Sequence, residues 1–282
     1  MLKQEKRTVI NNTMRYFLIL LLFCFSCNAF TQNTAKDFYK QAKQYDSLKN
    51  TEKAIEYYTM TIQTDSTFIN AYFNRAMAYI DIKQYDFSIK DLNVVINKTP
   101  NDYEALYFRG SCYALLKLYD NALTNLSKAL ELFPDYIESL TMRYQIYYEN
   151  KEYSKAKTDI EKLIKLNFLS PIIYFHLAYC FEKLSNKENA LLYLNKAIEM
   201  GYKTDISYNN RGNILAQLDM YSLAINDFEK AIEINPNNHL YYLDCAYCYY
   251  KLGMKTKAID YWKKVINMGY EIPPFAKEEI KN

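Results

Sequence analysis

The chain has 282 residues, half of them apolar, and a formal net charge of +3. This length suffices for one large domain or two small ones. Only 5 Gly and 6 Pro are present, too few turn formers for a sandwich or a barrel. The positive excess lies within residues 1–29, which hold four basic residues against one acidic residue. The remainder is therefore neutral and lacks the long-range field that attracts a polyanion, so we expect no nucleic-acid partner.

The first 29 residues have the order of a secretory signal sequence. Basic residues occupy the first fifteen positions, the apolar run FLILLLFCF covers 17–25, and small residues follow. This run is shorter than the roughly 20 residues that a membrane span needs. Translation could begin at Met1 or at Met14, since the segment from Met14 is a compact signal by itself. We therefore expect an exported protein of the periplasm or the cell envelope.

Two ways of processing this signal remain open, beside an uncleaved anchor. Cleavage after Ala29 would release a soluble protein, with residues 30–34 as a short linker. Cleavage before Cys27 would make Cys27 a lipidation site and the protein an outer-membrane lipoprotein. The residues Cys24–Cys27 resemble a bacterial lipoprotein box, and they depart from it at Cys24 and Phe25.

From residue 35 to residue 272 the chain repeats every 34 residues, and positions within a unit are numbered below as slots. The seven units are 35–68, 69–102, 103–136, 137–170, 171–204, 205–238 and 239–272. Slot twenty holds Ala54, Ser88, Ala122, Ala156, Ala190, Ala224 and Ala258. The remaining residues, 273–282, begin with two prolines, and we expect a short tail that caps the last unit poorly.

Other slots repeat as strictly. Slot eight is small in six of the seven units, with Tyr144 as the departure, and slots eleven and twenty-four are mostly aromatic or aliphatic. Slot thirty-two holds Pro100, Pro134 and Pro236. This order of small, Tyr, Ala, aromatic and Pro residues resembles the tetratricopeptide repeat. The resemblance implies an all-α fold, a right-handed α-solenoid of seven helix–turn–helix repeats.

The physical chemistry of the slots agrees with that fold. Slots four, eight and eleven share one face of a helix because they follow helical spacing. A small residue at slot eight and the Ala at slot twenty let the two helices approach closely, while larger rings fill the space around them. One helix pair cannot bury its face alone, so neighbouring pairs must stack.

No motif of an enzyme, a metal site or a cofactor site is present. The five glycines all fall at repeat positions and form no phosphate loop, and the two histidines are 63 residues apart, unlike a zinc motif on one helix. Cys245 and Cys248 form a CxxC motif, but Cys112, Cys180 and Cys248 all occupy slot ten. We expect packed, reduced thiols there, with a disulfide as the alternative in an exported protein.

In tetratricopeptide repeat proteins, slots two, five, six, nine, twelve and thirteen of the first helix line the concave groove. The resemblance therefore implies a partner-binding surface rich in rings and amides. Its residues are Phe73, Asn74, Tyr107, Phe108, Tyr148, Phe175, His176, Tyr179, Asn209, Asn210, Asn213, Asp244 and Tyr247. We expect a scaffold that binds a protein or a peptide segment. The alternative is a glycan or another small ligand, because rings stack on sugars and amides bind hydroxyls.

One partner common in the family can be excluded by residue type. Members that hold the carboxylate tail of a chaperone use Lys, Asn and Arg at particular slots of three consecutive units. Here Asn74 matches one of these positions, whereas Tyr39, Lys43, Glu104 and Phe108 do not match the others. We therefore expect no carboxylate clamp.

Overall fold

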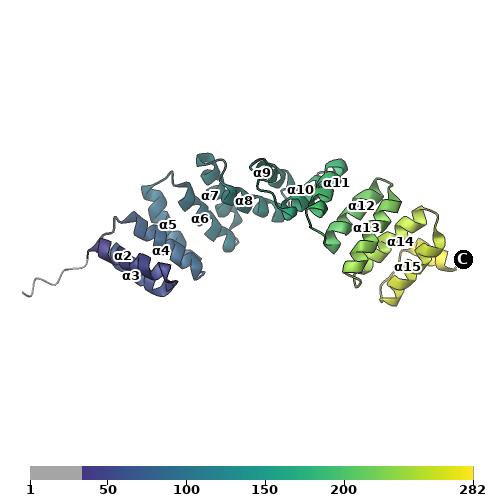
Figure 1. Cartoon of the computed structure of the whole chain (residues 1–282), viewed down its shortest axis with the longest axis horizontal. Helices are drawn as coiled ribbons and strands as arrows, with labels where there is room; N and C mark the ends of the chain where they lie inside the picture. The colour runs from purple at the N-terminus through teal and green to yellow at the C-terminus, as the bar shows by residue number, and fades with distance from the viewer. Residues whose placement is uncertain (1–33, 282) are drawn as a thin grey trace, which may run out of the picture. The chain divides into compact units, whose positions relative to one another are not determined.

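The computed structural model describes residues 34–281, which hold fifteen α-helices and no strand (Figure 1). The predicted all-α fold of paired helices is confirmed. The first helices of the pairs are α2 Ala35–Ser47, α4 Ile69–Asp81, α6 Tyr103–Leu115, α8 Ile137–Glu149, α10 Pro171–Lys183, α12 Asp205–Gln217 and α14 His239–Lys251. The second helices are α3 Thr51–Thr64, α5 Tyr85–Lys98, α7 Tyr119–Leu132, α9 Tyr153–Lys165, α11 Lys187–Glu199, α13 Tyr221–Ile234 and α15 Lys255–Asn267. A final helix, α16, covers Pro274–Lys281.

The helices fall into two compact units, one ending at Pro100 and one beginning at Asn101. The first contains α2–α5 and the second α6–α16. In both units every first helix begins at slot one and every second helix at slot seventeen, so the starts recur every 34 residues. The sequence period is thus the period of the helix pairs, and each slot has the same place in every pair.

The turn inside each pair depends on a left-handed residue at slot fifteen. These residues are Lys49, Lys83, Lys117, Lys151, Ser185, Asp219 and Gly253, with φ between 58° and 77°. The following N–H donates to the slot-eleven carbonyl, as in Leu118 to Tyr113 at 2.9 Å. This bond satisfies a carbonyl at the end of the first helix. Glycine is the usual residue for this conformation, yet only one turn uses it.

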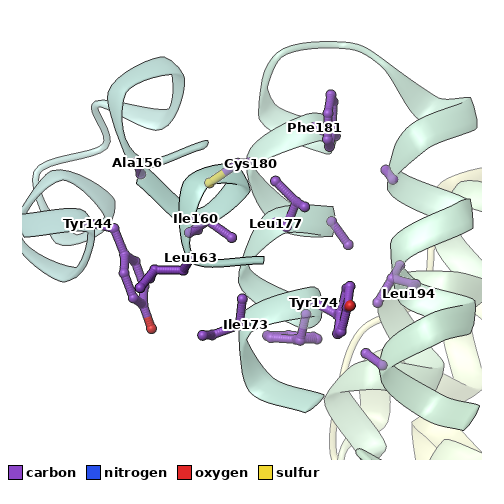
Figure 2. Close-up of a cluster of buried hydrophobic side chains, with 14 of the residues drawn as sticks. Tyr144, Ala156, Ile160, Leu163, Ile173, Tyr174, Leu177, Cys180, Phe181 and Leu194 are labelled. Atoms are coloured by element: carbon purple, nitrogen blue, oxygen red, sulfur yellow. The ribbon is translucent and has the colours of Figure 1, made fainter. Parts of the chain in front are cut away.

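The core lies between the two helices of each pair, and the seven residues at slot twenty are all 0% exposed. The largest cluster surrounds Ala156 and includes Ile160, Leu163 and Leu177, as Figure 2 shows. Tyr144 occupies a slot that is small in the other pairs, and its ring is buried in the same cluster at 2% exposure. The predicted close approach of the paired helices is therefore present.

The C-terminal tail differs from the expectation of a poor cap. Residues from Pro274 form α16, whose Phe275 ring meets the Trp262 ring edge-on with centroids 5.7 Å apart. Ile272 and Ala276 are buried against the same side of the last pair. The expectation was wrong because proline at the first position of a helix is tolerated, so Pro274 begins a helix instead of preventing one.

The predicted signal sequence, the lipidation site Cys27 and the linker up to residue 33 lie outside the described residues. Between residues 34 and 281, no helix combines the length and the apolar character that crossing a bilayer requires.

Candidate functional site

The thirteen residues predicted to bind a partner all lie on first helices of the pairs, and we call them the first-helix stripe. Eleven are half-buried, Tyr247 is exposed at 42% and Phe175 is buried at 8%. Half-buried side chains present part of their surface to a partner while the neighbouring pair holds them in place. Their role in binding stays a prediction.

In the first unit the stripe consists of Phe73 and Asn74 on α4. The Asn74 side-chain amide donates a hydrogen bond of 2.7 Å to the Tyr39 hydroxyl on α2. This bond joins neighbouring first helices and therefore already uses one of the amide protons that a partner would need.

On α6, at the start of the second unit, the stripe residues Tyr107 and Phe108 pack against each other. Their ring centroids are 5.0 Å apart, and Tyr107 also meets Tyr136 edge-on at 5.2 Å. Tyr136 is the N-cap residue of α8, so this contact holds the N-terminal end of α8 next to α6. These rings are oriented by their neighbours before any partner arrives.

A group of five contacting rings spans α8, α9 and α10, and we call it the aromatic cluster. It consists of Tyr144, Tyr148, Tyr153, His176 and Tyr179. Tyr148 lies at its centre, 4.6 Å from the His176 ring and 5.4 Å from the Tyr179 ring between centroids. Burial lowers the pKa of His176, so its imidazole is neutral at pH 7. The cluster is therefore an uncharged platform with hydroxyl edges.

Phe175 does not belong to this platform, although it was predicted to line the binding surface. Its ring is 8% exposed and packs against Tyr202, with centroids 4.9 Å apart. Tyr202 lies in the turn between α11 and α12, so the connection that leaves the pair of α10 and α11 covers Phe175. The residue is part of the core cluster, and its role in binding stays a prediction.

A second group of stripe residues lines a pocket between α12 and α14, which we call the α12–α14 pocket. Its volume is about 230 Å³, and its lining residues are Asn213, Ala216, Gln217, Phe228, Asp244, Tyr247 and Cys248. Burial raises the pKa of Asp244 to about 6. Asn209 and Asn210, on the same helix as Asn213, do not line the pocket. The Asn209 side-chain oxygen is buried without a hydrogen-bond partner among the described residues.

The structure also contains a repeated charged network that the sequence analysis missed. Arg143 at slot seven donates two hydrogen bonds to Asp159 at slot twenty-three and one to Ser127 of the preceding pair, at 2.7–3.0 Å. Arg75 and Arg211 make equivalent contacts, two to the Asp of their own pair and one to Thr59 or Asn195 of the preceding pair. The recurrence of Arg at slot seven with Asp sixteen residues later is the signal that could have revealed it. The network joins both helices of a pair to the pair before.

The cysteines fit the packing role that was expected of them. Cys180, Cys245 and Cys248 are free thiols, and these three and Cys112 are all 0% exposed. Burial raises the pKa of Cys245 and of Cys248 to about 12, so both thiols are protonated and weakly nucleophilic at neutral pH. Within residues 34–281, no three His, Cys, Asp or Glu side chains are grouped in a way that could hold a metal ion.

Comparison with known proteins agrees with this architecture. Family models described as tetratricopeptide repeat match residues 38–66, 103–136, 142–201, 206–238 and 242–268. A TPR repeat-containing protein of Methanocaldococcus jannaschii is 30% identical over 97 residues, which are 34% of this chain and 17% of that protein. Dynein axonemal assembly factor 4 of Pongo pygmaeus is 33% identical over 89 residues, 29% of this chain and 21% of that protein. The matched segments thus span about a fifth of these relatives.

Solved structures share the fold over a larger part of the chain. The C-terminal part of a TPR repeat-containing protein from Cytophaga hutchinsonii has a TM-score of 0.64 and 19% identity, covering 86% of this chain and 100% of that one. YrrB, described as a TPR protein with an unusual peptide-binding site, has a TM-score of 0.57 and 21% identity, covering 63% of this chain and 91% of that one. At these identities the likeness shows the fold alone. From the helix pairs, their 34-residue period and the family matches along both units, we conclude that the chain belongs to the tetratricopeptide repeat family.

Proposed function

We propose that this chain is a non-enzymatic scaffold that holds an extended segment of a partner protein along the first-helix stripe of α8, α10, α12 and α14. The observation that carries the proposal is that two different surfaces follow each other along consecutive first helices. The aromatic cluster covers α8 and α10, and the α12–α14 pocket follows. YrrB, whose description names a peptide-binding site, supports the proposal through its fold.

The two surfaces suit an extended backbone better than a compact ligand. Packed helices lie roughly 8–10 Å apart, and an extended chain advances about 3.3 Å per residue. The spacing between two neighbouring first helices therefore corresponds to about three residues of a bound segment. Four consecutive first helices are separated by three such spacings, so they accommodate a segment of about nine residues. Rings anchor its side chains, while amides such as Asn213 bond its backbone without adding net charge.

The test uses a library of random nine-residue peptides, displayed on phage and selected against the full chain. We expect binders, and we expect Tyr179→Ala combined with Asn213→Ala to weaken them at least about 30-fold, since truncating a buried anchor commonly costs about 2 kcal/mol. Binding is measured by isothermal titration calorimetry, with circular dichroism to verify that the double variant is folded.

The matched control is Lys196→Ala on α11, an exposed residue outside the stripe, which should leave binding unchanged. Equal binding by both variants would place the working surface elsewhere. A library without binders, together with thermal stabilisation by cell-wall fragments, would favour the glycan alternative.

The proposal also places the protein outside the cytoplasm, in the periplasm or attached to the envelope. Its support is the order of basic, apolar and small residues in positions 1–29. If Cys27 carries the lipid, Cys27→Ser should move the protein from the membrane fraction to the soluble fraction. A mature N-terminus that begins at Phe30, read by Edman degradation, would instead contradict lipidation and support cleavage after Ala29.

A further inference from the structure

The α12–α14 pocket contains a carboxylate that the fold leaves unpaired. Asp244 lies on its wall, and no hydrogen bond or ion pair reaches this carboxylate from any residue between 34 and 281. The other polar groups of the wall are the side-chain amides of Asn213 and Gln217 and the hydroxyl of Tyr247. Each of these carries an oxygen that can accept a hydrogen bond. The pocket therefore presents several acceptors and one negative charge to whatever enters it.

The repeat architecture does not require an acid at this position. Asp244 occupies slot six, and the other units have Lys40, Asn74, Phe108, Met142, His176 and Asn210 there. An equivalent pocket of about 290 Å³ lies between α6 and α8, and its slot-six residue is Met142. A methionine, an amide or a ring thus occupies this slot in other pairs, and Asp244 needs a different explanation.

Keeping Asp244 charged disfavours folding. Its pKa is raised to about 6 because burial removes water from the carboxylate and no cation replaces it. At neutral pH the group is still ionised, so the folded protein bears an uncompensated desolvation cost. A residue whose unpaired charge lowers stability marks a place where stability is exchanged for function.

We infer that the α12–α14 pocket binds the cationic end of a lysine or arginine side chain of the bound segment. The stem of that side chain would pack along Ala216 and the Tyr247 ring, and its charged end would donate to Asp244 and the neighbouring amides. Lys251 already lies over the Tyr247 ring, with its Nζ 5.4 Å from the centroid. The incoming cation is therefore assigned to the carboxylate and not to a cation–π contact. This inference rests on the proposed function.

Its test starts from the nine-residue peptides selected against the full chain. We expect one position of these peptides to be enriched in Lys or Arg. Replacing that residue by norleucine, which keeps the stem and removes the charge, should weaken binding to the wild-type chain at least tenfold. The same replacement should change binding to Asp244→Asn less than twofold, which would tie the preference to this carboxylate.

The matched control is Asp260→Asn, which removes the same charge from an exposed position on α15 of the same pair. For this variant the norleucine replacement in the peptide should still weaken binding at least tenfold. Asp244→Asn should also raise Tm at pH 7.5 by about 2–4 °C, because it removes an unpaired, half-buried charge. Binders without a basic preference, or a preference that survives in Asp244→Asn, would overturn the inference and leave the proposed function standing. A lower Tm for Asp244→Asn would also overturn it, since the fold would then be using the carboxylate. A library without binders would overturn both.

Discussion

Replacing Asp159 by alanine is expected to cost about 3–5 kcal/mol of folding free energy, the usual loss when one partner of a buried ion pair is removed. The Asp159 side chain is 4% exposed and that of Arg143 is 21% exposed. Two hydrogen bonds, of 2.9 Å from Nε and 2.7 Å from Nη2, hold the guanidinium against the carboxylate. Without Asp159 the positive charge of Arg143 stays in the packed region, where its partners are the neutral Ser127 hydroxyl and the Tyr147 ring, whose centroid lies 5.9 Å away. Urea denaturation of both proteins measures the loss.

The chain itself supplies a rescue for this variant. In the fifth pair, slots seven and twenty-three hold Leu177 and Tyr193 in place of Arg and Asp, and Leu177 is 0% exposed. Tyr193 stacks on Phe181 with centroids 5.5 Å apart. We therefore expect Arg143→Leu combined with Asp159→Tyr to recover stability to within about 1 kcal/mol of the wild type, because a buried ion pair is often replaceable by well-packed apolar groups.

The control for both variants is Asp135→Ala. Asp135 forms an ion pair with Lys162 at 3.1 Å, but its side chain is 60% exposed, so this loss should stay below about 1 kcal/mol. If Asp159→Ala costs no more than Asp135→Ala, the charged network does not stabilise the pairs. If the double variant is as unstable as Asp159→Ala, then Leu with Tyr cannot replace Arg with Asp at slots seven and twenty-three.

The sequence predicted those parts of the fold that depend on spacing along the chain. Close packing of two helices requires small side chains at fixed positions, so the alanines of slot twenty could be found by counting, and Ala156 and Ala224 are indeed fully buried. The helix starts follow the same count. The turns were harder to place, because lysines such as Lys117 and Lys151 occupy the left-handed position where glycine would be the recognisable signal.

The candidate site could be predicted only in outline, since its details depend on contacts between pairs. Slot numbers placed Phe175 and Tyr247 on the same stripe, yet Tyr202 covers Phe175 while Tyr247 stays exposed. Charge could not be judged from slots either. Arg143 and Asp159 are 16 residues apart and meet only after the helices pair. Asp244 has no ion-pair or hydrogen-bond partner in the described part of the chain because none of the side chains packed around it supplies one. Spacing along a helix does not reveal which side chains those are.

Replacing Trp262 by alanine is expected to cost about 3–5 kcal/mol, the range for truncating a fully buried large ring. Trp262 is 1% exposed on α15 of the last pair, between the rings of Tyr250 and Phe275 at centroid distances of 5.7 Å. Among the described residues α16 follows the last pair, so this ring and α16 cover that side of the core. A thermal melt followed by circular dichroism measures the effect. Ile266→Ala, at a 46% exposed position on the same helix, should cost less than about 1 kcal/mol.

Trp262 also reports whether α16 covers the last pair, because it is the only tryptophan of the chain. Its fluorescence emission should be blue-shifted in the full chain, as expected for a ring that is shielded from water. Ending the chain after Pro273 removes α16 with Phe275 and Ala276, and it also removes the contact of Lys255 with Glu279 at 2.9 Å. The emission should then move to longer wavelength, and Tm should fall because the last pair loses its apolar cover. An emission spectrum unchanged by the truncation would show that α16 does not shield the ring, and the cost of Trp262→Ala would then arise within α14 and α15 alone.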